Sequence, residues 1–184
     1  ARRFDGVVVV DEAYYEFYGE TMADKINQHP NVIVLRTFSK AMGMAGLRVG
    51  YLVSNKYLVD EIYKVKPPYN VNSFSQRAAE LLLEHRNIQM ERVQEIIESR
   101  EWLYQALDGL RGVEPYHSHA NFILIKVKDG LAVYKGLLEK GILVRHFADN
   151  PMLKNHLRIT IGRSEDNKFI LHSLAEVLTN MEEW

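Results

Sequence analysis

The sequence predicts an α/β fold: part of a mostly parallel sheet with flanking helices, followed by a smaller α/β domain. Short β-branched runs of strand length alternate with longer stretches of helical periodicity. A long amphipathic stretch at residues 87–110 predicts a helix that leads from one part into the next. We therefore expect one domain at residues 1–86 and a second at residues 87–184.

Three strands and a helix are expected in the first part. Val7-Val8-Val9-Val10 is a continuous β-branched run, which is typical of a strand buried on both faces of a parallel sheet. Residues 31–35 predict a second buried strand, and residues 47–53 predict a third. The helix is expected at residues 75–83.

The second part continues the alternation of strands and helices. We expect strands at residues 121–127, 142–146 and 157–162, and helices at residues 131–140 and 165–181.

Composition excludes several classes of protein. The 184 residues carry a net charge of -1, so no basic surface indicates nucleic acid or an anionic membrane as a partner. No apolar run approaches the roughly 20 residues that span a bilayer. The absence of cysteine excludes disulfides and fits a reducing compartment. His117 and His119 are the only close histidine pair, and we expect no metal site.

Chemically useful side chains follow two of the expected strands. Asp11 and Tyr14 come after the first strand, and Ser39 and Lys40 after the second. Ligands of open α/β sheets bind beyond the carboxyl ends of the strands. Each residue alone is more typical of an ordinary surface. Together they fit pyridoxal phosphate (PLP), which needs a lysine amine, a carboxylate at its ring nitrogen and polar groups around its phosphate.

Three motifs carry a family resemblance that runs through essentially all of the chain. They are Asp11-Glu12-Ala13-Tyr14, Arg36-Thr37-Phe38-Ser39-Lys40-Ala41 and Ala45-Gly46-Leu47-Arg48-Val49-Gly50-Tyr51. They resemble the fold type I PLP-dependent aminotransferases, and within them the histidinol-phosphate branch. Leu157-Arg158-Ile159-Thr160-Ile161-Gly162 falls in the order expected for that family.

The resemblance implies a role for each cofactor residue. Lys40 would bond the cofactor through its amine and shuttle a proton. Asp11 would pair with the ring nitrogen, and Tyr14 would contact the ring hydroxyl and help to set the proton affinity of the lysine linkage. The cofactor phosphate would be held by Thr37, Ser39 and Arg48. Residues 1–86 would be the lysine-bearing part of a large cofactor-binding domain, and residues 87–184 a connecting helix with a small C-terminal domain.

The same resemblance implies the substrates. Arg158 would bind the carboxylate of glutamate in one half-reaction and a phosphate in the other, and Arg145 would be a second phosphate contact. The implied reaction, in histidine biosynthesis, moves an amino group between L-histidinol phosphate and 2-oxoglutarate. A planar guanidinium can grip either anion with two hydrogen bonds.

The resemblance also implies partners and a location. Family chains are about twice as long, so we expect a missing N-terminal half of the same enzyme, and the start at Ala1 without methionine agrees with a natural N-terminus upstream. A homodimer in the cytoplasm is expected.

Three other functions stay open at this point. They are a PLP-dependent decarboxylase of a phosphorylated amino acid, an aminotransferase of broad aromatic or aspartate specificity, and a binding or scaffolding domain that kept a transferase fold. The set of Asp11, Lys40 and Arg48 argues against the last of these.

Overall fold

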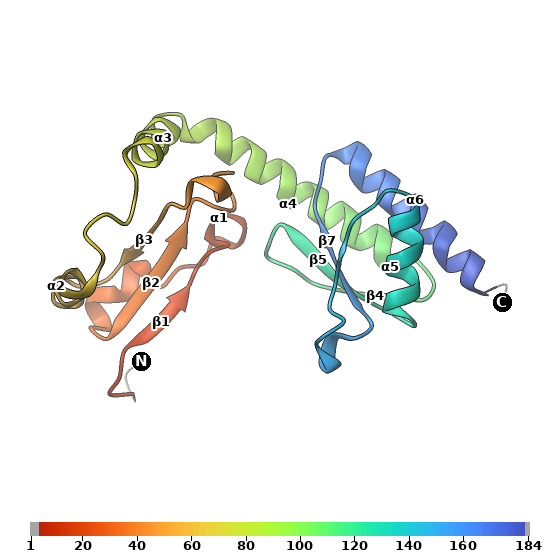
Figure 1. The fold of residues 1–184 in the computed structure, drawn as a ribbon, viewed down its shortest axis with the longest axis horizontal. Coiled ribbons are helices and arrows are strands. Elements are labelled where there is room, and N and C mark those ends of the chain that lie inside the picture. Colours follow the sequence, from red (N-terminus) through yellow and green to blue (C-terminus); the bar gives the residue numbers. More distant parts are fainter. Residues whose placement is uncertain (1–3, 183–184) are drawn as a thin grey trace. The chain divides into compact units, whose positions relative to one another are not determined.

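The computed structural model describes residues 4–182 and confirms the α/β class. The chain divides into two compact units, Ala1–Val93 (unit 1) and Gln94–Trp184 (unit 2). Helix α4 (Arg86–Asp108) begins in unit 1 and ends in unit 2 (Figure 1). The expected long helix is therefore confirmed to within two residues at each end. The functional division at residue 86 stays a prediction.

Unit 1 contains a three-stranded sheet in the order β1-β2-β3. Strand β1 (Val8–Asp11) runs parallel to β2 (Val32–Thr37), and β3 (Gly50–Val53) runs antiparallel to β2. The three expected strands are neighbours, but the third is shorter than expected. Residues Ala45–Leu47 form a 3-10 turn ahead of it.

The unit 1 helices are α1 (Tyr15–Tyr18), α2 (Lys56–Val65) and α3 (Ser73–Glu84). The sequence indicated only α3. Asparagine side chains cap both longer helices: the Asn55 side chain accepts a hydrogen bond from the amide of Leu58, and that of Asn72 accepts one from Ser75. Such caps satisfy amides that the first helical turn leaves without a partner.

The expectation that β1 is buried on both faces is wrong. Val9 is 53% exposed, whereas Val32 and Val34 of the central strand β2 are 1% and 0% exposed. Strand β1 lies at one end of the strand order, and its side chains alternate between half-buried and exposed (Figure 1). A β-branched run indicates a strand, but it does not say what covers that strand.

Unit 2 contains a four-stranded antiparallel sheet in the order β4-β5-β7-β6. Its strands are β4 (Val113–Tyr116), β5 (Phe122–Val127), β6 (Arg145–His146) and β7 (His156–Thr160). The strand expected at residues 142–146 is thus reduced to two residues. Strand β4 was not expected; it contains Pro115, which an edge strand tolerates because its missing amide breaks no central ladder.

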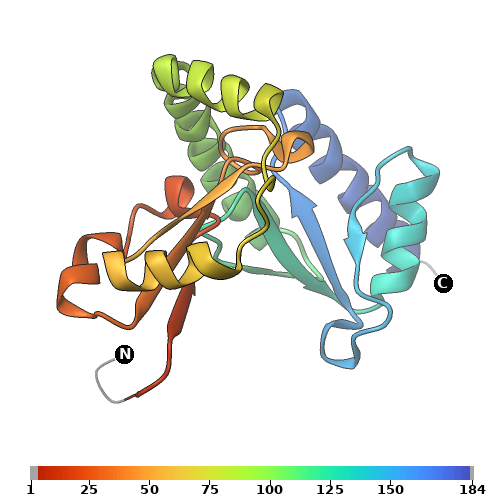
Figure 2. The same cartoon turned by 60° about the vertical axis from the view of Figure 1, so that its left-hand side comes forward.

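One face of the unit 2 sheet carries the main hydrophobic core. Helices α5 (Gly130–Glu139) and α6 (Ser164–Glu182) contact each other, as Figure 2 shows, and contribute to this core together with α4. The fully buried side chains of this core are Leu103, Leu107, Ile123, Ile125, Val133, Leu137, Leu157, Ile159 and Leu174. Because strand side chains alternate, Leu124 and Arg158 lie on the opposite face of the sheet.

The different strand pairing of β1 and β5 predicts uneven hydrogen exchange in the 184-residue chain made alone. We expect slow exchange at β5, which has a strand on each side, and fast exchange or self-association at β1, whose outer edge has no partner among the described residues. Peptide-resolved exchange at Val7–Val10 and Phe122–Val127 makes the comparison within one sample. Strong protection at Val7–Val10 in a demonstrably monomeric sample would contradict this prediction.

Candidate active site

The carboxyl ends of β1 and β2 bring several of the predicted residues to one edge of the unit 1 sheet. The two strands are parallel, so the turn after Asp11 and the turn after Thr37 emerge together. The Lys40 Nζ atom lies 5.6 Å from the centroid of the Tyr14 ring. Lys40 and Asp11 are exposed and Tyr14 is half-buried. An amine, a carboxylate and a phenol therefore occur at neighbouring strand ends.

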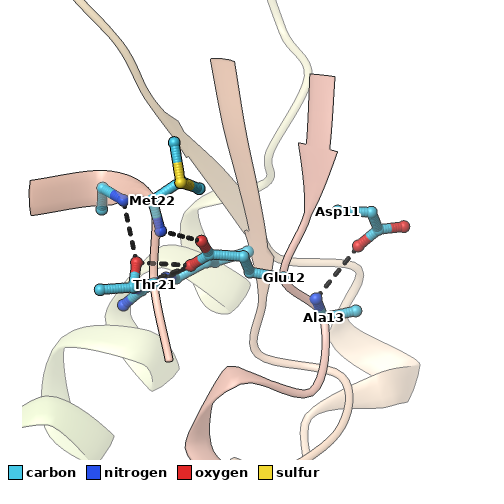
Figure 3. Close-up of polar contacts among 7 residues, drawn as sticks. Asp11, Glu12, Ala13, Thr21 and Met22 are labelled. Carbon is cyan, nitrogen blue, oxygen red and sulfur yellow. Dashed lines mark hydrogen bonds and ion pairs between the residues drawn. The ribbon is translucent and has the colours of Figure 1, made fainter. Parts of the chain in front are cut away.

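Local hydrogen bonds fix the turn that carries Asp11 and Tyr14. The Asp11 Oδ1 atom accepts a hydrogen bond from the amide of Ala13 at 3.0 Å, an Asx-turn (Figure 3). The Tyr14 carbonyl accepts from the amides of Phe17 and Tyr18 and starts α1. Phe17 is 4% exposed and anchors this short helix. The second carboxylate oxygen, Oδ2, of Asp11 takes no part in the turn bond.

The loop from Thr37 to Val49 is held at its base. The Thr37 hydroxyl accepts a hydrogen bond from the amide of Ser39 at 3.0 Å and donates to the Val49 carbonyl at 3.4 Å. The buried side chains of Phe38 and Met44 pack with Ala79 of α3. Lys40 thus projects from an anchored loop, which limits the positions of its amine.

Arg48 is the only described residue other than glycine with a positive φ. Its φ is 56° and its ψ is 47°, in the left-handed region that side chains disfavour. The Arg48 Nη1 atom donates to the Ala45 carbonyl at 2.9 Å, and the residue is exposed. Strained backbone of this kind gathers at ligand-binding positions. The sequence predicted Arg48 as a site residue but not its conformation.

Arg145 and Arg158 form a second cluster, in unit 2. They are Cα partners across β6 and β7, so both side chains leave the same face of the sheet. Both line a cavity of about 590 Å³, which has no aspartate or glutamate in its lining. The Arg158 Nε atom is buried and makes no hydrogen bond. Two neighbouring guanidiniums, one with an unused donor, suit an anion.

A partly buried ion pair in unit 1 was not predicted from the sequence. The Arg36 Nη2 atom lies 2.9 Å from Glu12 Oε2, and the two side chains are 13% and 7% exposed. Burial alone lowers the pKa of Arg36, but hydrogen bonds to Tyr51 and Glu12 outweigh it, and the pKa is raised. Removing one partner of such a pair should cost less than the about 3–5 kcal/mol that is typical of a fully buried pair. The available signal was a charged residue directly after the apolar run of β2.

Residues 4–182 contain neither a membrane-spanning helix nor a cluster of metal ligands. No helix between residues 4 and 182 is long and apolar enough to cross a membrane. Within the same range, no group of three or more histidine, cysteine, aspartate or glutamate side chains could hold a metal ion.

Comparison with known sequences gives consistent matches. The family model described as "Aminotransferase class I and II" matches residues 1–174. A histidinol-phosphate aminotransferase of Thermoanaerobacter sp. (strain X514) is 49% identical over 177 residues, which are 96% of this chain and 50% of that protein. The chain therefore spans about half the length of the curated relatives it matches.

Solved structures give the same fold. The histidinol-phosphate aminotransferase from Clostridium acetobutylicum superposes with a TM-score of 0.87 at 26% identity, covering 96% of this chain and 55% of that one. The L-threonine-O-3-phosphate decarboxylase from Porphyromonas gingivalis gives 0.83 at 27%, covering 93% and 55%. The histidinol-phosphate aminotransferase from Sinorhizobium meliloti, solved in complex with pyridoxal-5'-phosphate, gives 0.83 at 27%, covering 95% and 49%.

Proposed function

The chain belongs to the aminotransferase class I and II family, and from that premise we propose that it is part of a PLP-dependent aminotransferase. The proposed reaction moves an amino group between L-histidinol phosphate and 2-oxoglutarate. The observation that carries the proposal is the amine of Lys40 beside the ring of Tyr14, at the ends of two parallel strands that also carry Asp11. The relatives named as histidinol-phosphate aminotransferases support the choice of substrate.

The unit 1 residues fit PLP chemically. Bound PLP acts as an electron sink for the carbon that carries the amino group. In this proposal Lys40 holds the cofactor through Nζ and moves a proton there, while the Asp11 carboxylate keeps the ring nitrogen protonated. Tyr14 donates to the ring hydroxyl. The phosphate contacts are Thr37, Ser39 and Arg48. The strained backbone at Arg48 supports an anion-binding role for it.

The unit 2 arginines fit the substrates. A guanidinium can bind a carboxylate or a phosphate with two parallel hydrogen bonds. Arg158, with its buried and unused Nε donor, would bind the α-carboxylate of glutamate and, in the other half-reaction, the phosphorylated substrate. Arg145, its strand neighbour, would add a phosphate contact. The proposal also includes the rest of the enzyme chain, a homodimer and a cytoplasmic location.

Labelling of Lys40 tests the cofactor assignment. Borohydride reduction of the PLP-loaded full-length protein, followed by peptide mapping, is expected to place the label on Lys40, because its exposed amine follows a buried strand. Lys56 and Lys64 on α2 serve as internal controls, since their amines are paired with Asp60 and Glu61. A label on either of them instead would show that Lys40 is not the cofactor lysine.

A decarboxylase acting on a phosphorylated amino acid is the second candidate. It is favoured by the structural likeness to the L-threonine-O-3-phosphate decarboxylase of Porphyromonas gingivalis, at a TM-score of 0.83. Both enzymes would share the lysine loop and the phosphate contacts. An assay of the full-length protein for glutamate formation and for carbon dioxide release separates them. Glutamate formed from 2-oxoglutarate with L-histidinol phosphate as donor supports the aminotransferase.

A further inference from the structure

Two side chains and one main-chain amide meet around the carboxylate of Glu12. Its Oε2 atom accepts hydrogen bonds from Arg36 Nε at 3.1 Å, Arg36 Nη2 at 2.9 Å and the Thr21 hydroxyl at 2.8 Å. Its Oε1 atom accepts from the amide of Met22 at 2.6 Å, as Figure 3 shows. Arg36 Nη2 also donates to the Thr21 hydroxyl at 2.7 Å. Both carboxylate oxygens are therefore engaged by groups of the protein itself.

The Glu12–Arg36 ion pair joins the ends of the two strands that carry the candidate site. Glu12 directly follows the last residue of β1, and Arg36 is the last residue but one of β2. Asp11 and Glu12 point in opposite directions in Figure 3. Asp11 is the register partner of Leu35, and the side chains of Leu35 and Arg36 point to opposite faces of the sheet. The Asp11 side chain therefore lies on the face opposite to that of Arg36. The ion pair thus lies behind the surface on which Asp11 is exposed.

Arg36 also reaches the turn that carries Tyr14. Its guanidinium carbon lies 3.5 Å from the centroid of the Tyr15 ring, so the cation stacks on the residue next to Tyr14. Tyr51, its register partner on β3, helps to raise the pKa of Arg36. One side chain therefore contacts both ends of the Glu12–Tyr15 turn and the neighbouring strand.

We propose that the Glu12–Arg36 ion pair is a positioning pair, which sets the placement of Asp11 and Tyr14 relative to Lys40. This inference rests on the proposed function. A buried ion pair can often be replaced by apolar side chains with little effect on stability, so stability alone gives no reason for one here. Its directional hydrogen bonds can, by contrast, hold two strand ends in one fixed arrangement. Neither residue touches the cofactor in this scheme.

A set of variants in the PLP-loaded full-length protein separates positioning from stability. Glu12→Gln and Arg36→Met each leave one buried charge without its partner, and both should lower the melting temperature. The double variant Glu12→Gln/Arg36→Met removes both charges of the pair and should recover much of that loss. It still lacks the ion pair between the strand ends, so Asp11 and Tyr14 should stay displaced relative to Lys40.

The readouts are the absorbance of the bound cofactor against pH, and kcat. Tyr14 and Asp11 set the proton affinity of the lysine-bound cofactor, so their displacement should move the pH midpoint by about one unit in the double variant. We expect kcat to fall roughly 10- to 100-fold with a much smaller change in KM, as for other small displacements of reacting groups. Without cofactor, the amides of the Glu12–Tyr15 turn should exchange faster. Arg36→Lys, which keeps the charge but loses the second hydrogen bond, should give a partial shift.

Arg100→Met is the matched control. Arg100 is a buried arginine of unit 2 whose Nη1 donates to the Ala120 carbonyl at 2.9 Å. Its loss should lower the melting temperature and leave the pH midpoint unchanged. A double variant or an Arg36→Lys variant with the wild-type pH midpoint and kcat would overturn the positioning role, as would an equal shift in Arg100→Met. Wild-type protein that takes no label at Lys40 would overturn the proposed function as well, which keeps the two failures apart.

Discussion

Lys40→Ala in the full-length protein is expected to abolish amino-group transfer. Lys40 is proposed both to hold the cofactor and to move the proton, and the proton transfer alone is worth roughly 10²–10⁴-fold in rate. Because Lys40 is exposed, its loss should leave the melting temperature of the cofactor-free protein unchanged. The measurements are single-turnover transfer from glutamate and the absorbance of the bound cofactor. Transfer at the wild-type rate would exclude Lys40 as the catalytic lysine.

Two further variants are compared with Lys40→Ala. Lys64→Ala removes an exposed lysine that pairs with Glu61, and it should behave as wild type. Asp11→Asn should bind the cofactor weakly and turn over slowly, because the amide cannot stabilise the positive charge on the ring nitrogen. An Asp11→Asn variant with the wild-type rate would remove Asp11 from the ring nitrogen while leaving Lys40 in place.

Arg158→Lys is expected to weaken both half-reactions. The α-carboxylate of glutamate and the phosphorylated substrate are proposed to use the same guanidinium, and a lysine keeps the charge but loses the two-pronged geometry. Loss of one charge-assisted hydrogen bond corresponds to a fall in kcat/KM of roughly 10- to 100-fold for each substrate. Steady-state kinetics with glutamate and with histidinol phosphate measure the two effects. A defect confined to one substrate would contradict a shared site.

Arg145→Ala distinguishes the two arginines of the cavity. It should weaken the binding of the phosphorylated substrate much more than the binding of glutamate, because Arg145 is proposed to contact only the phosphate. Equal losses for the two substrates would remove it from the phosphate site. Arg163→Lys is the matched control, since Arg163 pairs with Asp166 and Glu165 and does not line the cavity. Its kinetics should match the wild type.

The elements predicted from sequence are those with strong local patterns. Strand β2 and helices α4, α5 and α6 were found within a few residues, because long apolar runs and helical spacing reflect burial directly. Strand β4 was missed because Val-Glu-Pro-Tyr contains a proline and a charge, which an edge strand accepts. Helix α2 was missed, and its start depends on the cap formed by Asn55.

In the candidate site, too, the sequence predicts local features but not the contacts that depend on strand register. The residue types and the order of Asp11, Tyr14 and Lys40 along the chain were sufficient to predict the cofactor class, because strand ends are local features and ligands bind beyond them. The sequence placed Arg145 and Arg158 13 residues apart; only the register of β6 on β7 makes them neighbours.

What the sequence by itself determined is the fold class, the family motifs and the identity of the candidate site residues. The tertiary structure alone decided which of them meet and what holds them there. The Glu12–Arg36 ion pair joins residues 24 positions apart, and the left-handed conformation of Arg48 depends on the turn before β3. The physical reason is that a periodic pattern records only how each residue is buried along its own element. Which charges face each other is fixed by strand register and by packing between elements, which no local pattern contains.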